Sequence, residues 1–260
     1  MVLTLASTWH PRGENQRLVR LWPILKKVYG PMIFCLHPGS DPAEIDRLAQ
    51  QLGPQACFVI VKDWPTGRYE AMKRAVQSGD APVQYADLDR LLRWVETRPD
   101  EWRRTAEAIV QNDCLVIGRT PTAYATHPEA LIWTERISNL VISRLLGIDL
   151  DLSAGSKGFS HTAAQFILDN SAPIRALGTD AEWPILCHRA GFQVKGCLVE
   201  GLDWESADRY ADQAAGSDAQ SQAARLYDQN AEHWAWRVQV AEEIIQAGLD
   251  AMRRPLKPTD

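Results

Sequence analysis

The sequence lacks several patterns that define large classes of protein. Neither a Gly-x-Gly-x-x-Gly nor a Gly-x-x-x-x-Gly-Lys-Ser/Thr motif is present, which argues against dinucleotide-binding and P-loop proteins. The five cysteines lie far apart without any Cys-x-x-Cys pair, and most of them fall inside apolar, strand-like runs. An odd number of dispersed cysteines provides no disulfide framework and is typical of reduced thiols inside a cell.

An excess of positive charge is also missing. The 260 residues contain 28 Lys and Arg against 33 Asp and Glu, which gives a net charge of -5. This balance argues against a protein that wraps nucleic acid through bulk electrostatics. It does not exclude phosphorylated ligands, because a bound cation can reverse the local field.

No apolar run is suited to cross a membrane. The longest helical apolar region, residues 130–150, is interrupted by several polar and charged side chains. The first residues open directly into a strand-like run, so we expect no signal peptide. From these absences we expect a cytoplasmic protein without a membrane span.

What is present is an alternation of strand-like and helix-like segments. Hydrophobic residues make up 45% of the chain and charged residues 23%, as in ordinary globular proteins. Three βα units followed by a fourth strand predict an α/β fold with a doubly wound, mostly parallel sheet. The predicted strands in this part are residues 2–6, 32–36, 56–61 and 83–86, and the predicted helices are residues 17–29, 41–52 and 69–77.

The second half of the chain continues less regularly. It is predicted to contain helices at 91–111, 128–146, 163–168 and 226–252, strands at 114–118 and 193–199, and a glycine-bearing stretch at 154–158. Residues 205–225 are rich in Ala, Ser, Asp and Gln, which is typical of a mobile segment or a weak helix. We therefore expect residues 1–204 to form the main domain. Residues 205–260 would add the mobile segment, a C-terminal helix and a tail packed on that domain.

The most informative motif is the strand-like run 83–89, which ends in Asp87 and Asp89. Two carboxylates one residue apart at the end of a strand can direct oxygen atoms at one hard divalent cation, and such a cation can hold a diphosphate. Ligands of doubly wound sheets gather beyond the carboxyl ends of the strands, where Ser7, Asp63 and the acidic pair are all expected to lie. The simpler alternative is that either acid caps the helix that follows.

Four stretches together resemble GT-A fold glycosyltransferases of the family 2 type. They are residues 61–68, 85–89, 153–160 and 177–183, and the resemblance spans roughly residues 1–204. It implies a metal-dependent enzyme that moves a sugar from a nucleoside-diphosphate sugar to a hydroxyl group of a small molecule or a glycan. It also implies that Mg²⁺ or Mn²⁺ is bound by Asp87 and Asp89.

The resemblance implies further contacts with the donor. The residues concerned are Ser7, Asp63, Arg68, Asp87, Gly155 and Lys157. Asp63 would meet the nucleobase and ribose, Arg68 a phosphate, and Lys157 the diphosphate. Simpler explanations exist for each of them, because Asp63 also suits a turn cap, Arg68 and Lys157 suit solvated charges, and Gly155 suits an ordinary turn.

Catalytic and metal-ligating roles are implied for acids later in the chain. Asp180, with Glu182 in reserve, would deprotonate the acceptor hydroxyl if the sugar is inverted and would orient the sugar if its configuration is retained. Both acids also suit the positive start of a helix. Many relatives take a third metal ligand, often histidine, from a loop after the last core strand, and the matching stretch here offers Asp203.

The first strand departs from the family pattern. A Pro-x-x-Asn-Glu type of segment is usual after it, whereas this chain has Ser-Thr-Trp-His-Pro at residues 7–11, with Glu14 and Asn15 later. Among the ten tryptophans, four are expected at loop mouths, where their faces suit nucleobases or sugars. These four are Trp9, Trp64, Trp183 and Trp204.

Two other classes of function stay open at this stage. A haloacid-dehalogenase-type phosphatase also uses Asp-x-Asp, with the first Asp as nucleophile, but its motif normally follows the first strand and has Thr or Val where this chain has Leu91. A non-catalytic scaffold that binds a nucleotide sugar or a partner is the other alternative. The oligomeric state, including a homodimer, is left open by the sequence.

Overall fold

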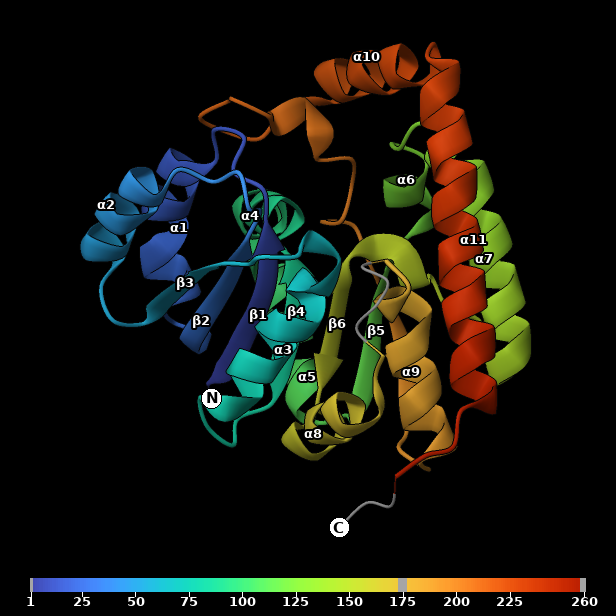
Figure 1. Cartoon of the computed structure of the whole chain (residues 1–260). Coiled ribbons are helices and arrows are strands. Elements are labelled where there is room, and N and C mark those ends of the chain that lie inside the picture. The colour runs from blue at the N-terminus through green and yellow to red at the C-terminus, as the bar shows by residue number, and fades with distance from the viewer. Residues whose placement is uncertain (1, 173–176, 258–260) are drawn as a thin grey trace.

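The structure, a computed structural model, describes residues 2–172 and 177–257 (Figure 1). One sheet of seven strands runs through this part of the chain in the order β3-β2-β1-β4-β6-β5-β7. Strand β6 runs antiparallel to β4 and β5, and the other neighbouring strands are parallel. The α/β class and the mostly parallel sheet are therefore confirmed. The strands are β1 (Leu3–Trp9), β2 (Tyr29–Leu36), β3 (Ala56–Ile60), β4 (Val83–Asp87), β5 (Cys114–Arg119), β6 (Ser156–Phe159) and β7 (Val194–Val199).

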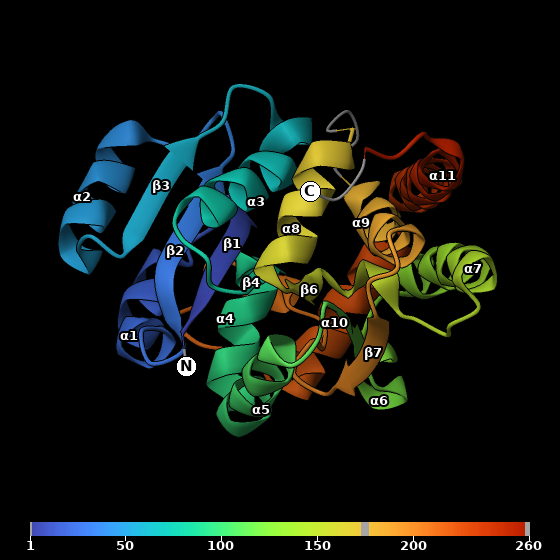
Figure 2. The ribbon, with the colours of Figure 1, turned by 90° about the horizontal axis from the view of Figure 1, so that it is seen from below.

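Helices cover both faces of the sheet (Figure 2). One buried cluster contains side chains of α3, α8, α9 and α11, and the other contains side chains of α1, α2, α4 and α5. The helices are α1 (Asn15–Leu25), α2 (Pro42–Leu52), α3 (Gly67–Gln77), α4 (Leu88–Thr97), α5 (Pro99–Val110), α6 (Pro121–Tyr124), α7 (Glu129–Leu146), α8 (His161–Asn170), α9 (Thr179–Arg189), α10 (Ser217–Asp228) and α11 (Ala231–Arg253). None of the described helices is both long and apolar enough to cross a membrane.

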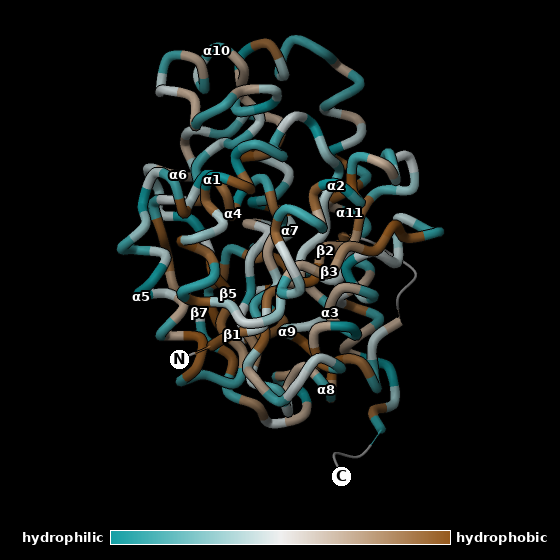
Figure 3. The backbone as a smooth tube through the Cα atoms, turned by 90° about the vertical axis from the view of Figure 1, so that its left-hand side faces the viewer, coloured by the Kyte–Doolittle hydropathy of each residue, from teal (hydrophilic) through white to brown (hydrophobic). Residues whose placement is uncertain are grey.

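The strands pack on both faces because their side chains alternate between the two clusters. In β2, Ile33 and Cys35 belong to one cluster, while Phe34 and Leu36 belong to the other, and all four are buried. Continuous burial of this kind is expected for parallel strands covered on both sides. The hydrophobic segments accordingly gather at the strands in the interior, whereas the chain around α10 is mostly hydrophilic (Figure 3).

The strands are added to the sheet in one direction from β1 to β3 and in the other direction from β4 onward. From β1 the chain moves outward through β2 to β3, and it then returns to place β4 on the other side of β1. The connections after β1 and β4 therefore leave in opposite directions, and a crevice forms between the carboxyl ends of these two strands. Thr8 and Asp87 are neighbours in the β1–β4 register at this point.

The elements differ from the sequence-based expectation in several places, two of which lie close to β4. The predicted helix at 91–111 is two helices, α4 and α5, which meet at Arg98. Pro99 explains the break, because proline has no N–H to continue α4 and restricts the residue before it to extended conformations. The glycine-bearing stretch at 154–158 contains β6, a short strand that pairs with β4 and β5 on its two sides.

Residues 205–225, expected to be a mobile segment or a weak helix, contain a short 3-10 turn and most of α10. We call residues 203–215 the strap; it contains a short 3-10 turn, Ser206–Asp208, and leads into α10. Arg93 of α4 lies 2.7 Å from Asp203 (Nε to Oδ1) and 2.7 Å from Asp208 (Nη1 to Oδ1), and Arg17 of α1 lies 3.2 Å from Asp208. Arg17 also pairs with Glu96 at 2.8 Å. We refer to these five residues as the strap clamp.

Candidate functional site

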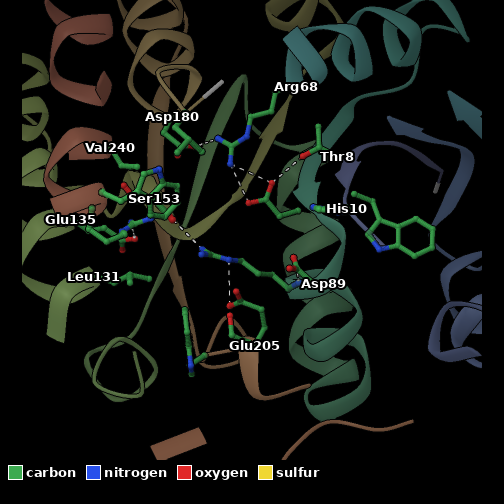
Figure 4. Close-up of a pocket in the computed structure, with 18 of the residues that line it drawn as sticks. Thr8, His10, Arg68, Asp89, Leu131, Glu135, Ser153, Asp180, Glu205 and Val240 are labelled. Atoms are coloured by element: carbon green, nitrogen blue, oxygen red, sulfur yellow. Dashed lines mark hydrogen bonds and ion pairs between the residues drawn. The ribbon is translucent and has the colours of Figure 1, made fainter. Parts of the chain in front are cut away.

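A cavity of about 280 Å³ opens at the carboxyl ends of β1 and β4 (Figure 4). Its first half is formed by residues that follow β1, β3 and β4. Its second half is formed by the strap and by α7, α10 and α11, which lie beside the sheet (Figure 1). The cavity therefore occupies the place where the topology of the sheet predicts a ligand.

Asp87, the last residue of β4, lies at the floor of this cavity. Its backbone N–H donates a 2.9 Å hydrogen bond to the carbonyl oxygen of Gly155. Gly155 has a φ of +72°, and a Cβ at this position would lie 2.5 Å from Oδ2 of Asp87. Residue 155 must therefore be glycine for both conformational and steric reasons.

Three donors hold the Asp87 carboxylate. The hydroxyl of Tyr85 lies 2.6 Å from Oδ1, Nη2 of Arg68 lies 3.1 Å from Oδ2, and the hydroxyl of Thr8 lies 3.3 Å from Oδ1. Burial raises the pKa of Tyr85 well above its usual value, so the phenol stays protonated and donates. The side chain of Asp87 is still 21% exposed, and that exposed part faces the cavity.

Arg68 connects Asp87 to Asp180, the second residue of α9 (Figure 4). Nη1 of Arg68 lies 2.9 Å from Oδ1 of Asp180, and Nζ of Lys157 lies 2.6 Å from the same oxygen. Burial alone would raise the pKa of Asp180, but the charges of Arg68 and Lys157 hold it below its usual value. We call Arg68, Asp87, Lys157 and Asp180 the switch-point cluster.

Asp89, in the first turn of α4, has the opposite electrostatic environment. Burial, followed by the negative charges of Glu205 and Asp87, raises the pKa of Asp89 to about 7. Arg90 only partly offsets this charge, because it also pairs with Glu205 at 3.5 Å and donates to the carbonyl of Ser153. The carboxylates around Asp89 thus create a local excess of negative charge that a bound cation would stabilise.

Asp87 and Asp89 are the two side chains of this cavity that could hold Mg²⁺ or Mn²⁺. Across residues 2–172 and 177–257 no group of three or more His, Cys, Asp and Glu side chains is arranged to hold a metal ion. Mg²⁺ commonly binds through one or two carboxylates, completed by water and by phosphate oxygens of a substrate. Asp87 and Asp89 provide two carboxylates of this kind on the cavity wall.

Asp203 and Glu182 are engaged elsewhere. Asp203, considered as a third metal ligand, accepts two hydrogen bonds from Arg93, of 2.7 and 2.8 Å, and is not part of the cavity wall. Glu182, considered as a reserve catalytic acid, pairs with Arg254 at 2.7 Å and accepts a hydrogen bond from the backbone N–H of Ala172. Both of these carboxylates have structural partners.

Four of the residues expected to contact the donor also lie outside the cavity wall, and one of them is Gly155, described above. Ser7 is fully buried and donates a 2.6 Å hydrogen bond to the carbonyl of Ala86. Asp63 is exposed on the turn before α3. Lys157 is 1% exposed and lies beneath Asp180, so it supports that carboxylate from within the core.

Aromatic side chains line part of the cavity. Trp9, Trp64 and Trp204 contribute to its wall, whereas Trp183 is 1% exposed and packs against Tyr85 in the core, so its expected position at a loop mouth is wrong.

Next to Trp64, the rings of His10 and His37 stack with centroids 4.2 Å apart, and the ring of His37 meets Trp64 at 5.3 Å. Burial and the neighbouring His37 lower the pKa of His10, which keeps this ring neutral and favours stacking.

The second half of the cavity contains buried donors without a protein partner. They are Oγ of Ser153, Nε1 of Trp204 and Nε of Arg237, and each of these residues is 8% exposed or less. Apolar side chains of α7 and α11 surround them, namely Leu131, Val240 and Ile244. Buried donors rarely lack an acceptor, so this arrangement suits a ligand that offers oxygen atoms.

Several residues in or beside the cavity were not identified from the sequence. Tyr85 was detectable in principle, because strand alternation places it on the same side as Asp87. No sequence pattern near Glu205 or Arg237 predicts a place in the cavity. Glu205 is placed there by the strap, and Arg237 pairs with Glu135, 102 residues away in sequence.

Comparison of the chain with protein-family models, with curated proteins and with solved structures gives no match.

Proposed function

We propose that the protein is a metal-dependent glycosyltransferase, which moves a sugar from a nucleoside-diphosphate sugar to a hydroxyl acceptor. The observation that carries this proposal is the position of Asp87 and Asp89. Asp87 ends β4 and Asp89 follows it, where the order of the strands changes direction, and both line the cavity. The resemblance of residues 61–68, 85–89, 153–160 and 177–183 to GT-A enzymes of the family 2 type supports the same class.

Asp87 and Asp89 would hold Mg²⁺ or Mn²⁺. A divalent ion at this position supplies positive charge that neutralises the leaving diphosphate. Asp87 is prepared for this task by Tyr85, Thr8 and Arg68, which fix the orientation of its carboxylate through hydrogen bonds. The pKa of Asp89 is raised to about 7, mainly by burial, so cation binding near neutral pH is expected to release a proton from this carboxyl.

Asp180 is better suited to orient the sugar than to act as a base. Two cations, Arg68 and Lys157, share one of its oxygens and lower its pKa, and a carboxylate stabilised in this way has little tendency to take a proton. This favours the role that the resemblance gives to Asp180 in an enzyme that retains the configuration of the sugar.

The two halves of the cavity differ in the ligand that they suit. The half near β1 offers the faces of Trp64 and His10, which fit a nucleobase. The half near α11 offers the donors of Ser153, Trp204 and Arg237 among apolar side chains, which fits an acceptor with several oxygen atoms. We therefore assign the donor to the first half and the acceptor to the second.

A thermal-shift panel of UDP-, GDP- and ADP-sugars, each with and without Mn²⁺ or Mg²⁺, tests the proposal. One donor is expected to raise the melting temperature only when the metal is present, because a ligand that binds the native state stabilises it. The shift should disappear in Asp87→Asn and persist in Asp63→Asn, which changes an acid outside the cavity wall.

Two results would contradict the proposal. A panel without any metal-dependent shift would argue for a scaffold that binds a partner. Release of phosphate from small phosphoesters, lost in Asp87→Asn, would argue for a phosphatase in which Asp87 is the nucleophile.

A further inference from the structure

Helix α7 presents a stripe of large apolar side chains to solvent. Trp133, Ile137 and Leu140 are 53%, 57% and 57% exposed, respectively. Their spacing of four and three residues places them on one face of the helix. The opposite face packs against α11, and α7 lies at an outer edge of the molecule (Figure 2). A surface helix normally carries polar side chains on its outer face, so this stripe suggests a contact with another molecule.

The stripe ends in opposite charges. Glu129 lies four residues before Trp133, Arg144 lies four residues after Leu140, and both are exposed. From Glu129 to Arg144 the stripe is about 22 Å long, at 1.5 Å per residue. Its order is therefore acid, Trp, Ile, Leu and base along one face of the helix, and the guanidinium of Arg136 lies beside it, 5.9 Å from the centroid of the Trp133 ring.

Two copies of this stripe that run in opposite directions are complementary to each other. If two copies of α7 pack antiparallel around a twofold axis near Ile137, Glu129 of each copy meets Arg144 of the other. In the same register Trp133 meets Leu140, and the two Ile137 side chains meet near the axis. Spacings of four and three residues form the seam of two packed helices, and a contact that uses the same patch twice has twofold symmetry.

We propose that α7 is the interface of a twofold-symmetric homodimer. The complementary pairing of Glu129 with Arg144 and the net charge of -5 of the whole chain favour this occupant over an anionic lipid surface. The active cavity is not part of this surface, so the dimer does not depend on the proposed enzymatic function. One helix per subunit buries less than the roughly 1,600 Å² of a standard interface, so we expect a micromolar dissociation constant.

Sedimentation equilibrium of the full chain, at concentrations on the order of 1 to 100 µM, tests the proposal. The wild type is expected to shift from monomer to dimer over this range. Glu129→Arg alone and Arg144→Glu alone each create two like-charge contacts, so each should raise the dissociation constant about tenfold. The double variant, which exchanges the two charges, should return to the wild-type value.

Apolar substitutions provide the matched comparison. Ile137→Asp should keep the protein monomeric throughout the range, whereas Leu198→Asp, at a residue 59% exposed on β7, should not change the dimer. Circular dichroism confirms that each variant is folded. A wild type that stays monomeric, a dimer that persists in Ile137→Asp, or a double variant that fails to recover association would each overturn the proposal.

Discussion

The switch-point cluster and the strap clamp are built from the same chemistry but face different surroundings. Both consist of buried or partly buried carboxylates paired with Arg or Lys at distances of 2.6 to 3.2 Å. Arg68, Asp87 and Asp180 of the first cluster line the cavity, whereas no member of the strap clamp does. A dense set of ion pairs is therefore not evidence of a functional site by itself. What distinguishes the functional candidate is a carboxylate with one side open to a cavity at the reversal point of the sheet.

The largest effect on stability is expected in the strap clamp. Arg93→Met leaves Asp203 and Asp208 without their main partner, and breaking a buried ion pair from one side typically costs about 3 to 5 kcal/mol. Urea denaturation measures the free energy of unfolding. Arg103→Met, which removes an exposed pair with Asp100, is the control and should cost less than about 1 kcal/mol. Equal losses in the two variants would show that the strap clamp does not stabilise the fold.

The largest effect on ligand binding is expected in the switch-point cluster. Asp87→Asn removes one of two carboxylates proposed to hold the cation, so the dissociation constant of the donor in the presence of metal should rise at least about 100-fold. Isothermal titration calorimetry measures it with the donor found in the thermal-shift panel. Asp203→Asn is the matched variant in the strap clamp and should leave the constant unchanged. If Asp203→Asn weakens the donor as much as Asp87→Asn does, the distinction between the clusters fails.

The pH dependence of stability should differ in sign between Asp89, beside the switch-point cluster, and Glu96 of the strap clamp. The pKa of Asp89 is raised to about 7, so the stabilisation that comes from its bound proton is complete below the usual pKa of about 4 and is lost as the pH rises through about 7. For Glu96, burial alone would raise the pKa, but Arg20 and Arg17 lower it. Its stabilisation is present above about pH 4.3 and is lost at lower pH.

Urea denaturation of the metal-free protein from about pH 2 to about pH 8 measures both contributions. The free energy of unfolding of the wild type, relative to Asp89→Asn, should fall between pH 4 and pH 7. Relative to Glu96→Gln, it should rise as the pH increases from below pH 4 and then level off. If the two differences in the free energy of unfolding change in the same direction with pH, the pKa shifts assigned to Asp89 and Glu96 are wrong.

The smallest effect is expected at the acceptor half of the cavity. Ser153→Ala removes a hydroxyl that has no protein partner, so the melting temperature of the free protein should stay unchanged. The KM for the acceptor should rise about threefold to tenfold, as expected for one hydrogen bond, while the KM for the donor stays the same. Steady-state kinetics with each substrate varied in turn separates the two. A change in the donor KM alone would assign Ser153 to the other half.

The sequence predicts the core of the fold well because that information is local. Hydrophobic runs bounded by Gly, Pro and Asp identify β2, β3 and β4, and the position of Asp87 after β4 follows directly from them. Strand β6 was missed because its four residues include a glycine and a buried lysine, and its pairing with β4 and β5 decides its conformation. Such pairing is not encoded in a short window.

The partners of the predicted acids could not be derived in the same way. Arg93 and Asp203 are 110 residues apart, and Arg254 and Glu182 are 72 residues apart. In sequence, Asp203 is as good a metal ligand as Asp89, since both are carboxylates in segments that follow a predicted strand. Only the folded chain reveals that an arginine already binds Asp203, whereas Asp89 lies among other acids.

The close approach of Gly155 to Asp87 limits the directions from which the carboxylate can be reached. The backbone of residue 155 covers one side of Asp87, so closely that even a methyl group would collide with Oδ2. Tyr85, Thr8 and Arg68 occupy other sides. An ion or phosphate that binds Asp87 is therefore expected to approach from the side that faces the cavity, which Asp89 also lines, and not from the side that Gly155 covers.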